Sequence, residues 1–461
     1  MPTLLDSTDP RPIHFVGIAG AGMSALAELF VLRGMSVTGC DNNADNAADL
    51  RARGIDVQQG HNPAHVEKAR ALVVTSAMPK NHPELERARV LGLPVVRRAE
   101  ALGEATSGAA LIGVAGTHGK STTTVLTTLA LDAAGYDPTG YVGARVTAWE
   151  GNLRAGRADR FVVEADEFDR SFLALAPTVA IVTNIEADHL DIYDGMPDLI
   201  RTFAQYARNA RIIVLCADDA NANALTTPPT AEVIRYGLES PDARLRAINL
   251  RHEGLGTRFT VEYDGKVLGD VALVVPGQHN VLNALAALGA GLGLGLTVPA
   301  MAPGLAAFVG VERRFQLLGS VGDVMIVDDY AHHPTEVRAS VQAARAAAPD
   351  RRLVVAFQPH LFSRTRDFAA EFASALADVD VVCLLDIYPS REKPMAGVTS
   401  ALIGDVMTQL GHTPVWTGPR EALVQALDGI VRPNDLVVTM GAGDVTRSGH
   451  ELLAVLTART A

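Results

Sequence analysis

The sequence contains few cysteines, few aromatic residues and no apolar run long enough to cross a bilayer. Its three cysteines, Cys40, Cys216 and Cys383, are too widely spaced for a metal-binding pair or a disulfide framework, so we expect buried free thiols. The N-terminus lacks the basic and apolar segments of a signal peptide. The apolar run at 284–296 is too short and too rich in glycine for a membrane span. These absences predict a cytoplasmic protein without membrane insertion.

An excess of positive charge is also absent. The formal net charge is -12 over 461 residues, which argues against a nucleic-acid partner because such partners usually require a basic face. An anionic small molecule stays compatible with this charge, since helix N-termini and a few basic side chains can bind phosphate on an acidic protein. The length predicts several domains, each with its own core.

Strand-like and helix-like segments alternate along most of the chain, which predicts an α/β fold with parallel sheets. We expect three domains, at residues 1–106, 107–312 and 313–461. The first and third are predicted to be Rossmann-like, and the second to resemble a P-loop ATPase. Between residues 230 and 275, short β-like runs are joined by glycine and aspartate, which predicts β hairpins added to the central sheet.

The first glycine-rich turn, residues 17–24, follows a buried strand and opens a helix. Small residues there allow a pyrophosphate to approach the backbone N–H groups of the helix N-terminus. Asp41 closes the second strand, where dinucleotide-binding folds often place a ribose-binding carboxylate. Taken alone, this turn fits a phosphate-bearing nucleotide, a dehydrogenase cofactor or a tight turn without a ligand.

The second turn, G-T-H-G-K-S-T-T at 116–123, also lies between a strand and a helix. Its glycines allow the backbone to wrap phosphates, Lys120 can reach the outer phosphates, and the Ser121 hydroxyl suits Mg²⁺. A generic P-loop would begin with glycine at position 114, where this chain has Val114. The turn is therefore a variant loop, and it predicts an ATP or GTP site.

Two acidic clusters follow strands downstream of this loop. Glu164, in the cluster 164–167, is placed to complete a Mg²⁺ site with Ser121, because Mg²⁺ prefers oxygen ligands. In the cluster 183–191, His189 between two carboxylates suits a second metal ion or a phosphate. Considered in isolation, either cluster is more typical of a solvated loop than of a set of metal ligands.

Taken together and in this order, the motifs resemble the Mur ligase family. Those motifs are G-T-H-G-K-S-T-T, E-A-D-E, T-N-I-E-A-D-H-L-D and G-Q-H-N-V-L-N-A. Stretches 17–24, 327–337, 357–366 and 441–444 resemble the branch that joins L-alanine to UDP-N-acetylmuramate. The resemblance implies ATP-dependent ligation through an acyl phosphate. It also implies a UDP-sugar-binding first domain, an ATP-binding second domain and a third domain that closes as a lid.

The resemblance also implies residue roles. Binding of ATP would involve Gly116, Thr117, His118, Gly119, Lys120, Ser121, Thr122, His279, Asn283, Arg313, Arg314 and Asp329. Binding of UDP-N-acetylmuramate and L-alanine would involve Gly20, Ala21, Gly22, Met23, Ser24, Asp41, His61, Ser76, Tyr330, His332 and Arg364. The Mg²⁺ ligands would be Ser121, Glu164 and His189, and the catalytic residues Lys120, His189, His332 and Arg364. We expect a monomer or a weak homodimer.

The chain departs from the family pattern at three places. Ala19 stands where glycine is common, which is tolerable if φ is negative there, and Ser121 stands where threonine is common. The segment 198–211 contains no lysine, so the carbamylated lysine of several related ligases should not be transferred to this chain.

Several alternative interpretations stay open. They are a recycling ligase that attaches a murein tripeptide to the same sugar, an NAD-dependent oxidoreductase and a nucleotide-gated regulatory protein. His332 and His333, which precede Pro334, could also simply cap the following helix.

Overall fold

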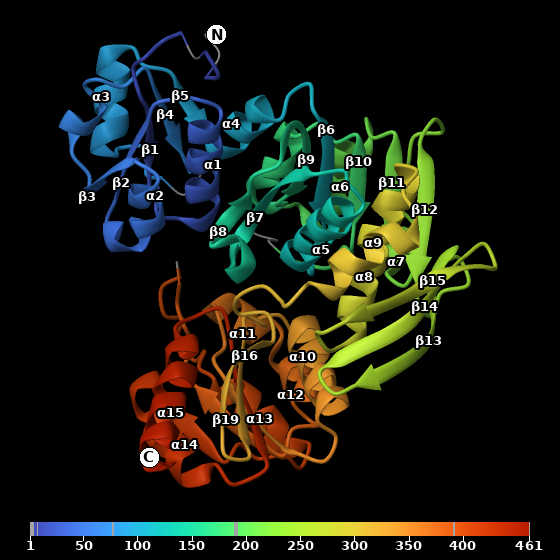
Figure 1. Cartoon of the computed structure of the whole chain (residues 1–461). Coiled ribbons are helices and arrows are strands. Elements are labelled where there is room, and N and C mark those ends of the chain that lie inside the picture. The colour runs from blue at the N-terminus through green and yellow to red at the C-terminus, as the bar shows by residue number, and fades with distance from the viewer. Residues whose placement is uncertain (1–3, 7, 76–77, 189–191, 391, 461) are drawn as a thin grey trace. The chain divides into compact units, whose positions relative to one another are not determined.

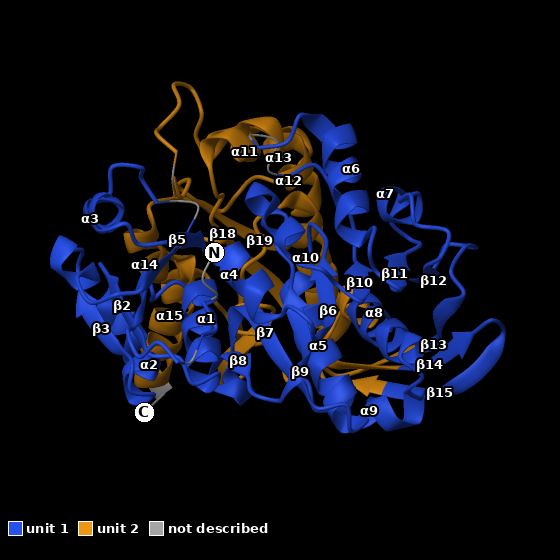
Figure 2. Ribbon diagram, turned by 90° about the horizontal axis from the view of Figure 1, so that it is seen from above, with its two compact units in different colours: residues 1–249, 259–271, 282–308 blue, residues 250–258, 272–281, 309–461 orange. Residues whose placement is uncertain are grey.

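The computed structural model describes residues 4–6, 8–75, 78–188, 192–390 and 392–460 (Figure 1). Three sheets with flanking helices confirm the predicted α/β class. The chain divides into two compact units, which Figure 2 colours separately. Unit 1 comprises residues 1–249, 259–271 and 282–308, and unit 2 comprises residues 250–258, 272–281 and 309–461.

The N-terminal sheet has five parallel strands in the order β3-β2-β1-β4-β5. The strands are β1 (Ile13–Val16), β2 (Val37–Asp41), β3 (Asp56–Gln59), β4 (Ala71–Val74) and β5 (Val95–Arg97). The helices are α1 (Ala21–Leu32), α2 (Ala48–Ala52), α3 (Pro83–Leu91) and α4 (Arg98–Ala105). All residues of β1 and β4 are buried, as expected for strands of a parallel sheet that is covered on both faces.

The central sheet has ten strands in the order β15-β14-β13-β12-β11-β10-β6-β9-β7-β8. Its first strands are β6 (Ala110–Ala115), β7 (Pro138–Val146), β8 (Gly151–Arg154), β9 (Arg157–Glu164) and β10 (Val179–Val182). The others are β11 (Ile212–Cys216), β12 (Glu232–Gly237), β13 (Leu245–Glu253), β14 (Gly256–Tyr263) and β15 (Lys266–Leu273). The helices are α5 (Lys120–Ala133), α6 (Gly195–Ala207), α7 (Ala220–Asn223), α8 (Gln278–Gly293) and α9 (Val298–Ala306).

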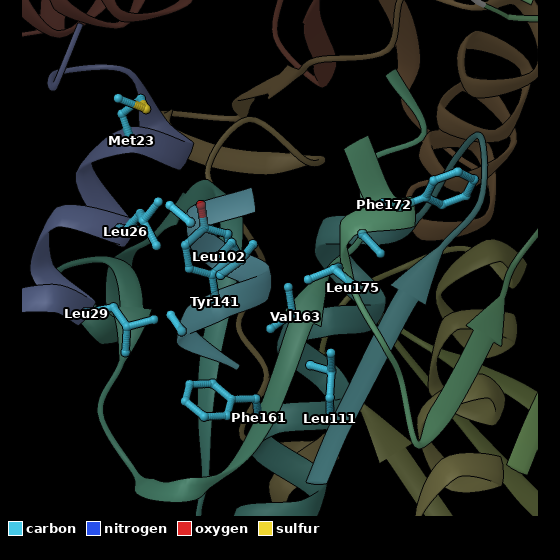
Figure 3. Close-up of a cluster of buried hydrophobic side chains, with 14 of the residues drawn as sticks. Met23, Leu26, Leu29, Leu102, Leu111, Tyr141, Phe161, Val163, Phe172 and Leu175 are labelled. Atoms are coloured by element: carbon cyan, nitrogen blue, oxygen red, sulfur yellow. The ribbon is translucent and has the colours of Figure 1, made fainter. Parts of the chain in front are cut away.

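A shared apolar core joins the N-terminal sheet to the central sheet within unit 1 (Figure 3). Leu26 and Leu29 of α1 and Leu102 of α4 belong to this core together with Tyr141 of β7 and Phe161 of β9. Tyr141 and Phe161 are almost completely buried, and aromatic side chains of this size contribute a large share of the apolar area removed from water. This core holds the glycine-rich turn before α1 close to β7.

The C-terminal sheet lies in unit 2 and has the order β16-β17-β21-β18-β19-β20, parallel except for the edge strand β16. The strands are β16 (Gln316–Val321), β17 (Val324–Asp329), β18 (Arg352–Phe357), β19 (Val381–Leu385), β20 (Trp416–Gly418) and β21 (Asp435–Met440). The helices are α10 (Pro334–Ala347), α11 (Phe362–Asp367), α12 (Ala369–Ala375), α13 (Ala401–Gln409), α14 (Arg420–Ile430) and α15 (Val445–Thr460).

Two predictions can be compared with the structure, namely the free buried cysteines and the lack of a membrane-spanning segment. Cys40, Cys216 and Cys383 are free and buried, as predicted. Among the helices of the described ranges, none has the length and apolar character that a bilayer crossing requires.

Candidate active site

The second glycine-rich turn connects β6 to α5, and its two glycines have backbone conformations that L side chains rarely adopt. Gly116 has φ +140° and Gly119 has φ +80°. A Cβ atom on Gly116 would lie 1.9 Å from Thr183 Oγ1, and one on Gly119 would lie 2.6 Å from Asn283 Oδ1. Glycine is thus needed at both positions for backbone conformation and for space.

The end of β10 fixes the conformation of this turn. The backbone N–H of His118 donates to Asn184 Oδ1 at 2.7 Å, and Thr183 Oγ1 donates to the His118 carbonyl at 2.6 Å. The Thr117 N–H donates to the Asn184 carbonyl at 3.0 Å. Sequence analysis assigned no role to Thr183 or Asn184 individually. The available signal was their position directly after a strand that lies beside β6 in the sheet.

Lys120 begins α5 and is paired with a buried carboxylate. Its Nζ lies 2.7 Å from Glu167 Oε2 and also donates to the carbonyls of Gly116 and Thr117, at 2.7 and 3.2 Å. Burial disfavours the charged amine, but Glu167 and Asp166 outweigh it and raise the pKa of Lys120 to about 12. Lys120 is therefore a fixed cation at the start of the helix. Sequence analysis did not anticipate Glu167 as its partner.

Ser121 and Glu164 lie together, as the sequence predicted. Ser121 Oγ is 3.0 Å from both carboxylate oxygens of Glu164, and the Gly143 N–H donates to Glu164 Oε2 at 2.6 Å. Glu164 ends β9, which pairs with β6 so that Val114 lies opposite Glu164. The Ser121 hydroxyl in the first turn of α5 and the carboxylate at the end of β9 form an oxygen donor set of the kind that Mg²⁺ prefers.

The first glycine-rich turn connects β1 to α1 and is tied to the end of β2. The Ala19 N–H donates to Asp41 Oδ2 at 3.0 Å. Ala19 is not among the residues with positive φ, so alanine fits there without strain. Gly20 forms the N-cap of α1, and Ala21 and Gly22 form its first turn. The side chain of Met23 is buried in the apolar core, so the predicted ligand contact would have to involve its backbone.

A basic cavity adjoins these elements, and sequence analysis missed it. It has a volume of about 180 Å³ and is lined by residues that include Arg97, Arg98 and Arg170. The Arg98 guanidinium is 3.4 Å from the Tyr141 hydroxyl, which itself donates to the Gly22 carbonyl at 2.5 Å. Its three guanidinium groups are suited to an anionic substrate, although Glu100 and Asp169 also line the cavity. The only sequence signal was the pair of adjacent arginines, which the structure places at the N-terminus of α4.

Unit 2 gathers Arg313, Arg314, Asp329 and Tyr330, which the sequence had grouped on the third domain. Both guanidinium groups lie over the Tyr330 ring, with Cζ at 4.8 and 5.2 Å from its centroid. Asp329 accepts hydrogen bonds from the Ala331 and Phe315 N–H groups and from Ser340 Oγ. Burial raises the pKa of Asp329 to about 6, although Arg314 opposes this shift.

The two histidines before Pro334 have different positions. His333 is the N-cap of α10, and its ring accepts a hydrogen bond from the Thr335 N–H, so the capping interpretation holds for this residue. His332 instead lies over Tyr330 in an edge-to-face contact, with Nδ1 2.9 Å from the Tyr330 carbonyl oxygen. A carbonyl can only accept a hydrogen bond, so Nδ1 carries the proton and Nε2 is left as the basic nitrogen.

The remaining candidates are divided between the two units. In unit 2, Arg364 of α11 is buried. The pKa of His279 is lowered to about 4, mainly by burial and secondly by the positive charge of Arg314. In unit 1, Asn283 Oδ1 accepts a hydrogen bond from Thr123 Oγ1 at 3.1 Å. Thr122 is buried in the first turn of α5. Ser76 and His189 lie outside the described residues, and His61 belongs to a histidine cluster treated below.

Models of the Mur ligase family match three parts of the chain. They are the catalytic domain of the family at residues 12–109, the middle domain at 114–291 and the glutamate ligase domain at 313–443. The chain therefore belongs to the Mur ligase family.

Its curated relatives include two UDP-N-acetylmuramate–L-alanine ligases. That of Salinibacter ruber is 42% identical over 97% of this chain and 95% of the relative. That of Acidothermus cellulolyticus is 44% identical over 95% and 94%. The solved UDP-N-acetylmuramate–alanine ligase of Thermotoga maritima has a TM-score of 0.84 and 28% identity, covering 97% of this chain and 100% of that one.

A murein peptide ligase of Psychrobacter arcticus is also similar in fold. It has a TM-score of 0.69 and 24% identity, covering 97% of this chain and 99% of that one. At this identity the likeness concerns the fold alone.

Proposed function

We propose that this chain joins L-alanine to the lactyl carboxylate of UDP-N-acetylmuramate at the expense of ATP, giving ADP and phosphate. This is a step of peptidoglycan precursor synthesis. The observation that carries the proposal is identity above 40% with alanine-adding ligases over nearly the whole chain. The loop at 116–123 adds independent support, because it has the glycines, the lysine and the hydroxyl of a nucleotide-binding turn.

The first chemical step brings two anions together. The carboxylate attacks the γ-phosphorus, an acyl phosphate forms and ADP leaves. Lys120 supplies a fixed positive charge, and phosphate binding requires its Nζ to exchange hydrogen bonds with Glu167 and the loop carbonyls for phosphate oxygens. Ser121 and Glu164 would hold a Mg²⁺ ion, which neutralises phosphate charge when bound.

In the second step, the alanine amine attacks the acyl carbon and phosphate leaves. The amine must lose a proton, and we assign its acceptance to His332 Nε2, because Nδ1 is already committed to the Tyr330 carbonyl. A His332→Ala change should lower alanine-dependent turnover by about 10²-fold or more and leave UDP-N-acetylmuramate binding near normal. Calorimetric titration measures that binding. Normal turnover in this variant would show that His332 does not accept the proton.

Phosphate release from ATP and Mg²⁺ tests the proposal, with UDP-N-acetylmuramate present and three acceptor conditions in parallel. Release that needs both the UDP-sugar and L-alanine is expected. Release only with the murein tripeptide would move the chain to the recycling reaction. No release in any condition would favour a nucleotide-gated binding protein.

We also propose that the enzyme works in the cytoplasm as a monomer or weak homodimer, without a nucleic-acid partner. Three free thiols support a reducing compartment. Sedimentation equilibrium across a range of concentrations tests the oligomeric state.

A further inference from the structure

Four histidines and one cysteine surround a buried glutamate in the N-terminal sheet domain. His14 lies on β1, Cys40 on β2, and Glu84 in the first turn of α3. His65 lies in the short 3-10 helix η2 (Pro63–Val66). Side chains alternate between the faces of a sheet, so every second residue of β1 and β2 points toward the same face. Cys40 belongs there to an apolar cluster with Val16, Val66, Ala69, Leu72, Val74, Leu85 and Ala88.

Glu84 is fully buried and receives several hydrogen bonds. Its carboxylate accepts from the Asn62 N–H at 3.0 Å and lies 2.8 Å from His65 Nδ1. The Cys40 thiol donates to both of its oxygens, at 3.2 and 3.1 Å. His61 and His82 stand farther away, with Nδ1 at 3.6 and 4.0 Å from Glu84 Oε2. Burying a carboxylate in an apolar layer costs free energy unless it is paired, which explains why several hydrogen-bond donors surround Glu84.

Three ring nitrogens of this group, His14 Nε2 and both nitrogens of His82, have no hydrogen-bond partner among the described residues. His14 is only 1% exposed, and its Nδ1 lies 3.0 Å from Thr38 Oγ1 on the adjacent strand. Its other ring nitrogen, Nε2, makes no hydrogen bond with any described residue. A buried nitrogen without a partner costs free energy, so this position requires an explanation beyond packing. Metal-binding histidines commonly show this arrangement, in which the second nitrogen is oriented by a neighbouring group.

The donor set and its spacing fit a transition metal. One ligand atom each from His14, Cys40, His65 and Glu84 lies within 4.8 Å of the other three. Tetrahedral Zn²⁺ with bonds of about 2.0–2.3 Å separates its ligand atoms by roughly 3.3–3.8 Å, so shifts of up to about 1 Å would bring these atoms to the required separations.

We propose that the N-terminal domain binds one zinc-class divalent transition-metal ion through His14, Cys40, His65 and Glu84. Binding converts the Cys40 thiol to a thiolate and releases one proton, so the two negative ligands balance the charge of the ion. Four protein ligands leave no open position, which makes the site structural. The ion would connect β1, β2, η2 and α3, and it would give His14 Nε2 a partner.

The proposal can be tested with Co²⁺, because the absorption spectrum of bound Co²⁺ shows both the coordination geometry and whether sulfur is a ligand. The full-length chain is freed of metal with a chelator and titrated with Co²⁺ in excess Mg²⁺, which occupies oxygen-donor sites. We expect one equivalent to give intense visible bands and a sulfur-to-cobalt charge-transfer band, and Zn²⁺ to displace it. Zn²⁺ should also raise Tm by several degrees, whereas Mg²⁺ should not.

Matched cysteine variants assign the sulfur. Cys40→Ser should lose the charge-transfer band, whereas Cys216→Ser and Cys383→Ser, which change the other two buried thiols, should keep it. His14→Gln should weaken Co²⁺ binding at least about 100-fold. A wild-type titration without a sulfur band, or with a band that persists in Cys40→Ser, would overturn the proposal. If Cys40→Ser does not fold, the wild-type band and the response of Tm to Zn²⁺ still decide.

Discussion

The phosphate loop and the histidine cluster both lie in unit 1, yet they bring charged groups together in opposite ways. The loop is eight consecutive residues at the end of β6, supported by the ends of the neighbouring strands. The four proposed metal ligands of the cluster come from four separate segments between residues 14 and 84. Each involves a buried glutamate, because Lys120 of the loop is paired with Glu167 and the cluster surrounds Glu84.

These two glutamates have pKa values shifted in opposite directions. Burial raises the pKa of Glu167 to about 7, although Lys120 opposes it. Burial acts in the same sense on Glu84, but hydrogen bonds from Cys40, the Asn62 N–H and His65, with an electrostatic contribution from His14, outweigh it and lower its pKa. Burial alone therefore does not set the charge of a carboxylate, because the number of donors that it receives decides.

The largest expected effect concerns the cation of the loop. Lys120→Met should reduce the kcat of phosphate release about 10³-fold, because no other group of the loop supplies a fixed positive charge to the reacting phosphate. The change also leaves Glu167 buried without its partner. The double variant with Glu167→Gln is the control, since it removes that unpaired charge and should stay inactive. Activity within tenfold of wild type would show that Lys120 is not needed.

The shape of the loop should matter nearly as much as its charge. Gly119→Ala forces a Cβ atom to within 2.6 Å of Asn283 Oδ1, and we expect a loss of about 10²-fold in kcat/KM from a displaced loop. Gly34→Ala is the matched control, because Gly34 has φ +79° but no atom within 4 Å of the added Cβ. It should cost about 1–2 kcal/mol of stability and no activity. Equal kinetic effects in both variants would mean that backbone strain alone explains the loss.

Substitutions in the histidine cluster should lower stability, whereas substitutions in the phosphate loop should lower activity. In metal-free protein, Glu84→Ala should lower the free energy of unfolding by about 3 kcal/mol, because several buried donors lose their acceptor. The kcat of the folded variant should stay close to that of wild type. Urea unfolding and phosphate release measure the two quantities on the same sample. A fall in kcat as large as that of Lys120→Met would remove the distinction between the two regions.

The smallest expected effect is a dependence of stability on pH. Because the pKa of Glu167 is raised from 4.5 to about 7, the folded state binds more protons than the unfolded state between these values. The contribution of Glu167 is thus fully present below pH 4.5 and is lost as the pH rises through 7. Relative to Glu167→Gln, wild type should lose on the order of 2 kcal/mol between pH 5 and 8. Parallel pH profiles of the two proteins would contradict this.

The phosphate loop could be predicted from local sequence patterns because the residues that would bind the nucleotide are consecutive in the chain. The strand before residue 116, the two glycines, Lys120 and Ser121 follow one another, and Glu164 ends the strand that pairs with β6. The support from Thr183 and Asn184 was not predicted, because it depends on which strand lies beside β6. The burial of the Met23 side chain was not predicted, although a helix that follows a glycine-rich turn must also turn one face to the core.

The sequence by itself determined the α/β class, the nucleotide loop and the membership of a ligase family, because strand and helix periodicity and consecutive motif residues are local properties of the chain. Only the tertiary structure decided that His14, Cys40, His65 and Glu84 meet in one buried group, that Lys120 is paired with Glu167, and that His332 rather than His333 keeps a basic nitrogen available. The physical reason is that these contacts depend on the order of parallel strands and on the side of the sheet that each helix covers, which residue spacing does not encode.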